Sequence, residues 1–137
     1  MHRCYLLLTL LFFALVSGNG SSRGAEPTSA PAAKTLRVAA VQMRSSRDLA
    51  ANIHAIDEHL ARAAKEGARV VVFPECALTG YFENEFMQAF TAEQLAEAER
   101  QVAESCRKHE VYAIVGTPWR EGEKLYNSAV VITPAGK

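Results

Sequence analysis

The chain alternates between short apolar runs and longer segments in which apolar residues recur at every third or fourth position. Short continuous runs are typical of β-strands, whereas the three-to-four spacing is typical of helices that bury one face. Four strands are therefore predicted, over residues 36–43, 70–73, 111–116 and 125–132. One helix is predicted between the first and second strands, and another between the second and third. This β-α-β-α-β-β order indicates an α/β fold built on a layered sheet.

The first predicted helix follows Ser45 and Asp48, which have the spacing of a capping box. Residue Gly67 is predicted to end it, because glycine readily takes the left-handed conformation of a helix C-cap. Its apolar positions form a single stripe that should face a core. The stripe comprises Leu49, Ile53, Ile56, Leu60 and Ala63 or Ala64.

The second predicted helix has its own capping residues, Thr91 and Gln94. Basic residues at 107–109 suit the negative end of a helix dipole, so the helix should end there. Its apolar stripe comprises Leu95, Ala98, Val102 and Cys106. Residues 76–90, which precede this helix, are predicted to form a loop.

The strands carry information about what surrounds the sheet. Residues 36–43 are apolar on both faces for most of their length, which predicts a strand covered on both sides. Thr117-Pro118 is predicted to end the third strand, because proline has no backbone N–H to donate. Residues 134–137 are typical of a tight turn. Since two helices can cover only one face of such a sheet, we expect this chain to be part of a larger fold.

The N-terminal residues predict a targeting segment. Residues 1–18 have a basic start, an apolar stretch and a small-residue end, which is the pattern of a secretory signal peptide. Ala25 offers another cleavage position, and an uncleaved anchor is the alternative. Residues 19–35 are rich in Ser, Ala and Pro and are predicted to be a flexible linker. The remaining domain, residues 36–137, is expected to be exported, to the periplasm or outside the cell, and shows no further membrane-spanning run.

Composition narrows the partners. The chain is 49% hydrophobic and balances 15 basic with 15 acidic residues, so neither nucleic acid nor a charged membrane surface is indicated as a partner. Cys4 lies in the predicted signal, which leaves Cys76 and Cys106. These two thiols could form one bridge in an exported protein, or stay buried and free.

The residue with the clearest chemical potential is Glu75. It follows an apolar run that Pro74 terminates, which places an acid at the carboxyl end of a predicted strand. Sites in open α/β sheets form outside that edge. From this stretch alone, Glu75 is either a general base in a cleft or a solvated acid at the start of a loop.

Five segments together resemble the nitrilase superfamily, the carbon–nitrogen hydrolases, in the family's order. Asn52 also stands where the family often has an asparagine, and Gly67-Ala68 precedes the second segment. The segments are residues 38–43 (VAAVQM), 70–75 (VVVFPE), 77–81 (ALTGY), 115–118 (VGTP) and 125–132 (LYNSAVVI). The resemblance covers residues 36–137, and its ordered set is far more specific than one short motif.

The resemblance implies an α-β-β-α sandwich, here incomplete, and a Glu-Lys-Cys triad that hydrolyses carbon–nitrogen bonds through a thioester. It implies that Glu75 is the general base. Tyr81 is a candidate pocket residue because it follows Glu75 closely in the sequence. The resemblance also implies a small amide, carbamoyl or nitrile substrate, no metal or other cofactor, and a homo-oligomer when the domain is complete.

The same resemblance implies that the lysine and the nucleophilic cysteine lie beyond residue 137. Lys137 does not match the lysine, and Cys76 stands at a variable position where its side chain should point away from that of Glu75. We therefore expect this chain to be the amino-terminal half of a hydrolase and inactive alone. The alternative is a binding or assembly module derived from the domain. An acyl transferase of the superfamily is disfavoured, because the lipoprotein-type members carry several membrane spans.

Two groups of polar residues could suggest a metal site or a pocket rim, but simpler explanations are expected for both. His54 and His59 lie on different faces of the first helix, so they should not share a metal. His54 is better placed to pair with Glu58 at the surface. Glu83 and Glu85 could shape a pocket rim, although a solvated loop is the default.

Three residues of the carboxyl-terminal hairpin are harder to assign. Asn127 and Ser128 match the family segment, yet packing and turn hydrogen bonds are the expected role for both. Trp119 is predicted to be either an interface or a core aromatic residue.

Overall fold

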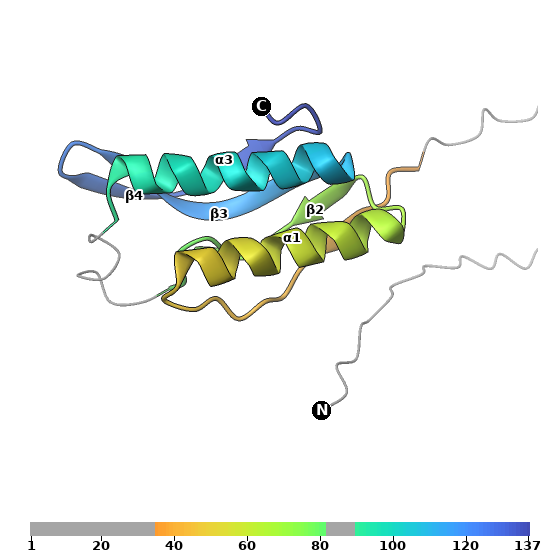
Figure 1. The fold of residues 1–137 in the computed structure, drawn as a ribbon, viewed down its shortest axis with the longest axis horizontal. Coiled ribbons are helices and arrows are strands. Elements are labelled where there is room, and N and C mark those ends of the chain that lie inside the picture. The colour runs from red at the N-terminus through yellow and green to blue at the C-terminus, as the bar shows by residue number, and fades with distance from the viewer. Residues whose placement is uncertain (1–34, 82–89) are drawn as a thin grey trace, which may run out of the picture. The chain divides into compact units, whose positions relative to one another are not determined.

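A computed structural model describes residues 35–81 and 90–137 of the chain. Its elements are β1 (Val38–Ala40), α1 (Leu49–Lys65), β2 (Val70–Val72), α3 (Ala92–His109), β3 (Tyr112–Glu121) and β4 (Lys124–Ile132) (Figure 1). The order matches the β-α-β-α-β-β prediction. The predicted signal peptide, almost all of the predicted linker, and Glu83 and Glu85 lie outside the described residues.

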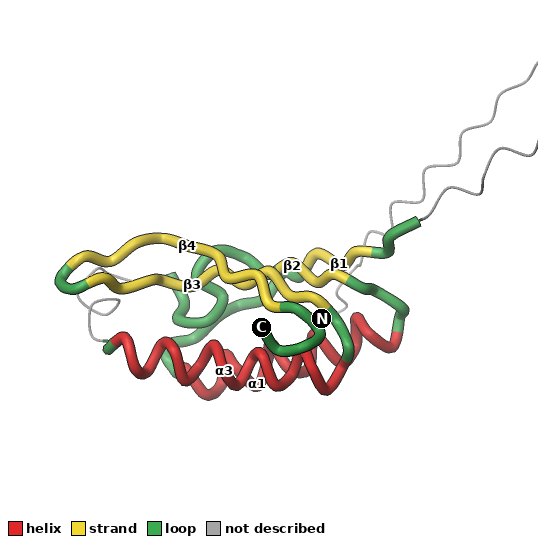
Figure 2. Tube along the Cα trace, turned by 90° about the horizontal axis from the view of Figure 1, so that it is seen from above, coloured by secondary structure: helices red, strands yellow, loops and turns green. Residues whose placement is uncertain are grey.

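The four strands form one sheet in the order β1-β2-β3-β4. The first three strands are parallel, and β4 returns antiparallel along β3. Both helices lie on the same side of this sheet (Figure 2). One sheet with one helix layer agrees with the incomplete α-β-β-α sandwich that was predicted.

The ends of α1 agree only in part with the predicted capping residues. Its N-cap is Asp48, whose carboxylate accepts from the N–H groups of Ala50 and Ala51. Ser45 does not cap the helix, since its hydroxyl donates instead to the carbonyl of Ala77 at 3.1 Å. Gly67 closes the C-terminus as predicted, with φ +80°. The prediction at the N-terminus was wrong because Ser45 is needed to hold a distant loop.

Helix α3 follows its prediction closely. Thr91 and Gln94 form the complete capping box, and the basic residues 107–109 occupy the last turn. All four predicted stripe residues are buried. Among the described residues, neither this helix nor α1 is long and apolar enough to cross a membrane.

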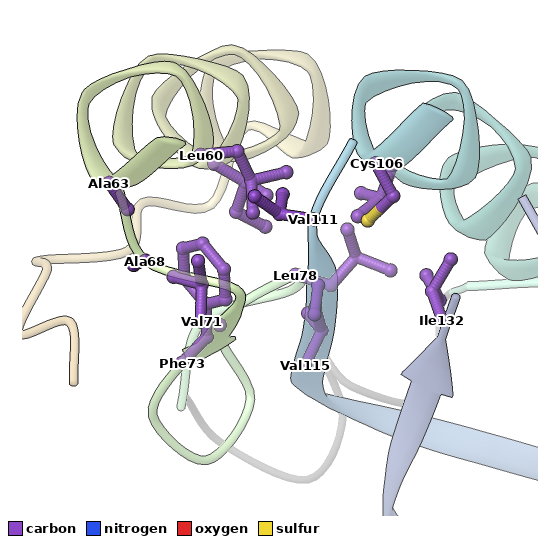
Figure 3. Close-up of a cluster of buried hydrophobic side chains, with 14 of the residues drawn as sticks. Leu60, Ala63, Ala68, Val71, Phe73, Leu78, Cys106, Val111, Val115 and Ile132 are labelled. Carbon is purple, nitrogen blue, oxygen red and sulfur yellow. The ribbon is translucent and has the colours of Figure 1, made fainter. Parts of the chain in front are cut away.

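The core lies between the two helices and the sheet (Figure 3). Side chains from α1 and α3 meet the inward side of β2, β3 and β4. The largest of the fully buried side chains in this layer include Ile56, Leu60, Leu78, Val71, Val102 and Val115. Since burying one such side chain stabilises a fold by about 1.5–3 kcal/mol, this layer is the principal source of stability in the described part.

The opposite face of the sheet is apolar and exposed. Val38, Val70 and Tyr112 stand side by side in the register of the three parallel strands. Val38 is 61% exposed and Val131 on β4 is 59% exposed. The described helices therefore cover only one face of the sheet, as expected, and the second cover predicted for the first strand is not among the described residues.

Strand β3 is longer than predicted. It runs through Thr117 and Pro118 to Glu121, and pairs residue by residue with β4. The missing N–H of Pro118 is tolerated because β2 has already ended, so no strand of the described residues flanks that side of β3 at Pro118. Gly122, with φ +58°, then begins a two-residue hairpin of the II′ kind.

A polar cluster joins the two helices. Asp57 of α1 accepts hydrogen bonds from His109 at 2.9 Å and Lys108 at 3.4 Å, both on α3. Burial raises the pKa of Asp57, but hydrogen bonds from His109, Ser105 and Lys108 outweigh it, and the net pKa lies below the ordinary value. The cluster therefore favours the ionised carboxylate in the folded chain.

Replacing Asp57 with Asn should lower the free energy of unfolding by about 1–2 kcal/mol at neutral pH, since hydrogen bonds to a charged group are lost. Because the pKa of Asp57 is lower in the folded chain, its carboxylate stabilises the fold above the unfolded-state pKa of about 3.9. This stabilisation is lost as the pH falls through the folded-state pKa. The difference from the parent protein in urea unfolding should thus shrink below about pH 4. Glu58→Gln, at an exposed pair with His54, is the control; an equal loss there would contradict the role of Asp57.

Candidate active site

The candidate site is the sheet edge where β2 ends. Phe73 still donates its N–H to Ile114 of β3, and Pro74 then ends the pairing. The next residue, Glu75, is exposed. It therefore presents a carboxylate beyond the carboxyl end of a parallel strand, where sites in open α/β sheets form.

The backbone that carries Glu75 lies directly against Gly116 of β3. A Cβ atom at Gly116 would come within 2.4 Å of the carbonyl oxygen of Pro74 and within 2.7 Å of the Cα of Glu75. Real Cβ contacts essentially never come this close, so only glycine fits. The absence of a side chain at Gly116 therefore allows the backbone of Glu75 to pack directly against β3.

The carboxylate of Glu75 has a defined partner on β4. The side-chain Nδ2 of Asn127 donates to its Oε1 at 2.6 Å, across 52 residues of sequence. The predicted role of Asn127, in packing and turn hydrogen bonds, is thus incomplete. Its neighbour Ser128 does make the expected kind of contact, since its hydroxyl donates to the carbonyl of Thr117 at 2.7 Å.

A short compact loop continues from Glu75. Gly80 donates its N–H to the carbonyl of Cys76 at 2.7 Å, and Leu78 donates to the carbonyl of Gly116 at 3.2 Å. Residues 76–80 are all buried, unlike Glu75. The loop therefore fills the space beside β3 that β2 leaves empty.

Asn52 of α1 fastens this loop to the rest of the domain. It is 2% exposed, and its Nδ2 donates to the carbonyls of Leu78 at 2.9 Å and Ser46 at 2.8 Å. Its Oδ1 accepts from the N–H of Ser46 at 2.7 Å. The resemblance had placed an asparagine here, and the contacts show what the amide does: it ties the loop after Glu75 to the segment before α1.

The described part of the chain holds two cysteines, Cys76 directly after Glu75 and Cys106 on α3. Both Cys76 and Cys106 are free and buried, which agrees with the simpler of the two sequence interpretations. Burial, followed by the neighbouring charge of Glu75, raises the pKa of Cys76, and burial raises the pKa of Cys106 to about 11. Since the thiolate is the reactive form, both environments disfavour nucleophilic chemistry.

Two predicted aromatic positions are exposed. Tyr81 is 76% exposed at the end of the described loop, and no described contact brings it to Glu75. Trp119 is 51% exposed and packs against Tyr126 of β4, with ring centroids 5.4 Å apart. Trp119 is therefore a surface aromatic residue in the described part of the chain.

The other polar groups lie away from this edge. His54 pairs with Glu58 at 3.6 Å on the surface, as expected. A shallow cavity of about 720 Å³ lies between α1 and α3 and includes His54 and Asp57, but no residue of the Glu75 loop. Within residues 35–81 and 90–137, no three His, Cys, Asp or Glu side chains gather as metal ligands do.

The sequence predicts Glu75 as a site residue but does not predict the residues that surround it. The ordered family segments contained Gly116 and Asn127, and Asn52 was noted beside them, yet nothing in their spacing paired these residues with the Glu75 loop. The signal that could have joined them is the hairpin register, which sets Gly116 opposite Ala129 and places Asn127 one pleat further along β4.

Comparison with known proteins gives a consistent result. A family profile described as carbon-nitrogen hydrolase matches residues 37–137. The chain is 36% identical over 88 residues to a nitrilase of Pyrococcus abyssi, covering 62% of this chain and 34% of that protein. It is 33% identical over 101 residues to omega-amidase NIT2 of Danio rerio, covering 73% of this chain and 36% of that protein. The chain thus spans about a third of the length of these relatives.

A solved structure extends the similarity to the fold. It is a mutant of the amidase from Nesterenkonia sp. AN1, which shows covalent addition of the acetamide moiety of fluoroacetamide at the active site cysteine. The TM-score is 0.72 at 25% sequence identity, and the match covers 78% of this chain and 41% of that one.

Proposed function

Because this chain belongs to the carbon–nitrogen hydrolase family, of amidase and nitrilase type, we propose that Glu75 is the general base of an amide hydrolase. The observation that carries the proposal is the setting of Glu75. Its carboxylate is exposed beyond the end of β2, yet its backbone lies against Gly116 and its Oε1 accepts a 2.6 Å hydrogen bond. A solvent-exposed acid with no other role than being part of a surface loop would need neither of these two contacts.

The proposed reaction uses a cysteine thiol as nucleophile. Glu75 takes the proton of that thiol, and the thiolate attacks the carbonyl carbon of the amide. A lysine stabilises the negative charge that develops on the carbonyl oxygen. Ammonia or an amine then leaves with the proton, and water activated by the same carboxylate cleaves the thioester. The covalent addition at the active site cysteine of the amidase supports the nucleophile in this scheme.

We propose a small amide as the substrate class. One of the relatives is an omega-amidase and the solved relative is an amidase. The nitrilase relative keeps a nitrile as the second candidate. Both chemistries begin with thiolate attack on an electrophilic carbon, so Glu75 would have the same first task in either.

This chain supplies the base but, in the proposed scheme, neither the lysine nor the nucleophile. Cys76 and Cys106 are both buried with raised pKa values, which disfavours either as the nucleophile. The exposed apolar face of the sheet, with Val38 and Val131 more than half exposed, would also favour association. We therefore propose that residues 35–137 alone are inactive and associate in solution, and that the complete protein is a homo-oligomer.

The test is a direct assay. The natural protein containing this chain should release ammonia from acetamide, while purified residues 35–137 should release none. Association of the isolated chain can be measured by light scattering. An isolated chain that is monomeric and active would contradict the proposal. A natural protein that binds acetamide without releasing ammonia would favour a binding module instead.

A further inference from the structure

We propose that Asn127 is a positioning residue that orients the Glu75 carboxylate and decides which of its two oxygens takes the proton. This inference rests on the proposed role of Glu75 as general base. It goes beyond that role because it assigns separate tasks to Oε1 and Oε2, and gives β4 a part in the chemistry.

The sheet register explains why the two side chains meet. Gly116 pairs with Ala129 across the β3–β4 ladder, and the Glu75 backbone lies over Gly116. Asn127 is two residues from Ala129, so it projects from the same face of the sheet. Diagonal neighbours of this kind lie about 7–8 Å apart, which a side chain can span. The contact thus follows from strand pairing rather than from a chance contact between two flexible surface side chains.

The chemistry fixes which end of the amide faces Glu75. An ionised carboxylate only accepts hydrogen bonds, and an asparagine side chain donates only through Nδ2. The amide nitrogen must therefore face the acid, as the 2.6 Å contact from Nδ2 to Oε1 has it. Hydrogen bonds to an ionised carboxylate are shorter and stronger than those between neutral groups.

The contact makes the two carboxylate oxygens different. Oε1 is engaged by Asn127, so Oε2 is the oxygen available to the thiol. When the thiol S–H bond breaks, the O–H bond forms at Oε2, and Oε1 remains a carbonyl oxygen that still accepts from Nδ2. The same proton later leaves from Oε2 to the departing nitrogen. The hydrogen bond therefore persists in both protonation states and holds one geometry throughout.

A structural role alone does not account for Asn127. The residue is exposed, so its side chain contributes little to the core. Cross-strand stabilisation near this point comes from Ser128, whose hydroxyl donates to Thr117 across the same hairpin. Loss of Asn127 should therefore leave folding nearly unchanged and alter the behaviour of Glu75.

The experiment uses the natural protein with acetamide as the substrate. Asn127→Ala should lower kcat by about 10- to 100-fold, because a misplaced catalytic group loses rate steeply. Asn127→Asp preserves the shape but sets a second carboxylate against Glu75. Repulsion between two facing carboxylates raises the pKa of one of them. The acid limb of the kcat/KM profile should therefore shift to higher pH in this variant. The control Lys124→Ala, at the exposed start of β4, should change neither quantity.

A double-mutant cycle with Glu75→Gln separates this inference from the proposed function. If Asn127 acts through Glu75, adding Asn127→Ala to Glu75→Gln should lower kcat by less than about twofold. A further loss of about tenfold would overturn the inference, as would Asn127 variants that retain parental rates and pH profile while Glu75→Gln is inactive. Parental turnover in Glu75→Gln itself would instead overturn the proposed function.

Discussion

Replacing Glu75 with Gln is expected to lower kcat for amide hydrolysis by about 1,000-fold in the natural protein. Glutamine has the same size, and its carbonyl oxygen can still accept the hydrogen bond from Asn127. It cannot take a proton from the thiol. The substitution thus removes the base while it preserves the geometry, and single-turnover release of ammonia from acetamide measures the loss.

The change should leave folding intact, because Glu75 is exposed and contributes little to the core. Glu123→Gln is the matched control, since Glu123 is an exposed acid in the β3–β4 turn and not a residue of the Glu75 loop. The control should keep the parental rate. If both variants lost activity equally, or if Glu75→Gln kept it, Glu75 would not be the base.

The second large effect is expected at Gly116. Substitution with Ala would place a Cβ within 2.7 Å of the Glu75 Cα and still closer to the Pro74 carbonyl oxygen. Both obstacles are backbone atoms, so the loop must move. Overpacking of this kind costs about 1–3 kcal/mol of stability. Displacing Glu75 should in addition lower kcat by about 100-fold, measured beside the melting temperature.

Gly122→Ala separates the steric effect from the loss of a glycine. At Gly122 the added Cβ would meet nothing within 4 Å, although φ is +58°. It should therefore cost about 1–2 kcal/mol of backbone strain and leave kcat unchanged. Parental activity in Gly116→Ala, or equal loss of activity in both variants, would show that Gly116 does not position Glu75.

The candidate site is a sheet edge rather than a pocket. The described cavity lies between the helices, and its lining includes no residue of the Glu75 loop. At this edge an exposed acid is held in place by three contacts. Gly116 lies against the backbone of Glu75, the Asn127 amide donates to its carboxylate, and Asn52 binds the loop that follows. Each constraint comes from a different element of the fold.

The sequence determined the elements of this protein and their order. The apolar stripes of α1 and α3 were predictable because helical spacing is local, and every predicted stripe position of α3 is buried. The caps at Thr91 and Gly67 were predictable for the same reason. The position of Glu75 after a strand that Pro74 ends was also predictable from the sequence, and the resemblance to the family implied its role.

Tertiary structure alone decided what each polar residue does. Ser45 donates to the Ala77 carbonyl instead of capping α1, and Pro118 stays within β3 because no described strand flanks it on that side. The pairing of Asn127 with Glu75 depends on hairpin register and on a loop resting on Gly116. Local spacing cannot encode a contact across 52 residues, because strand pairing sets which side chains share one face of a sheet.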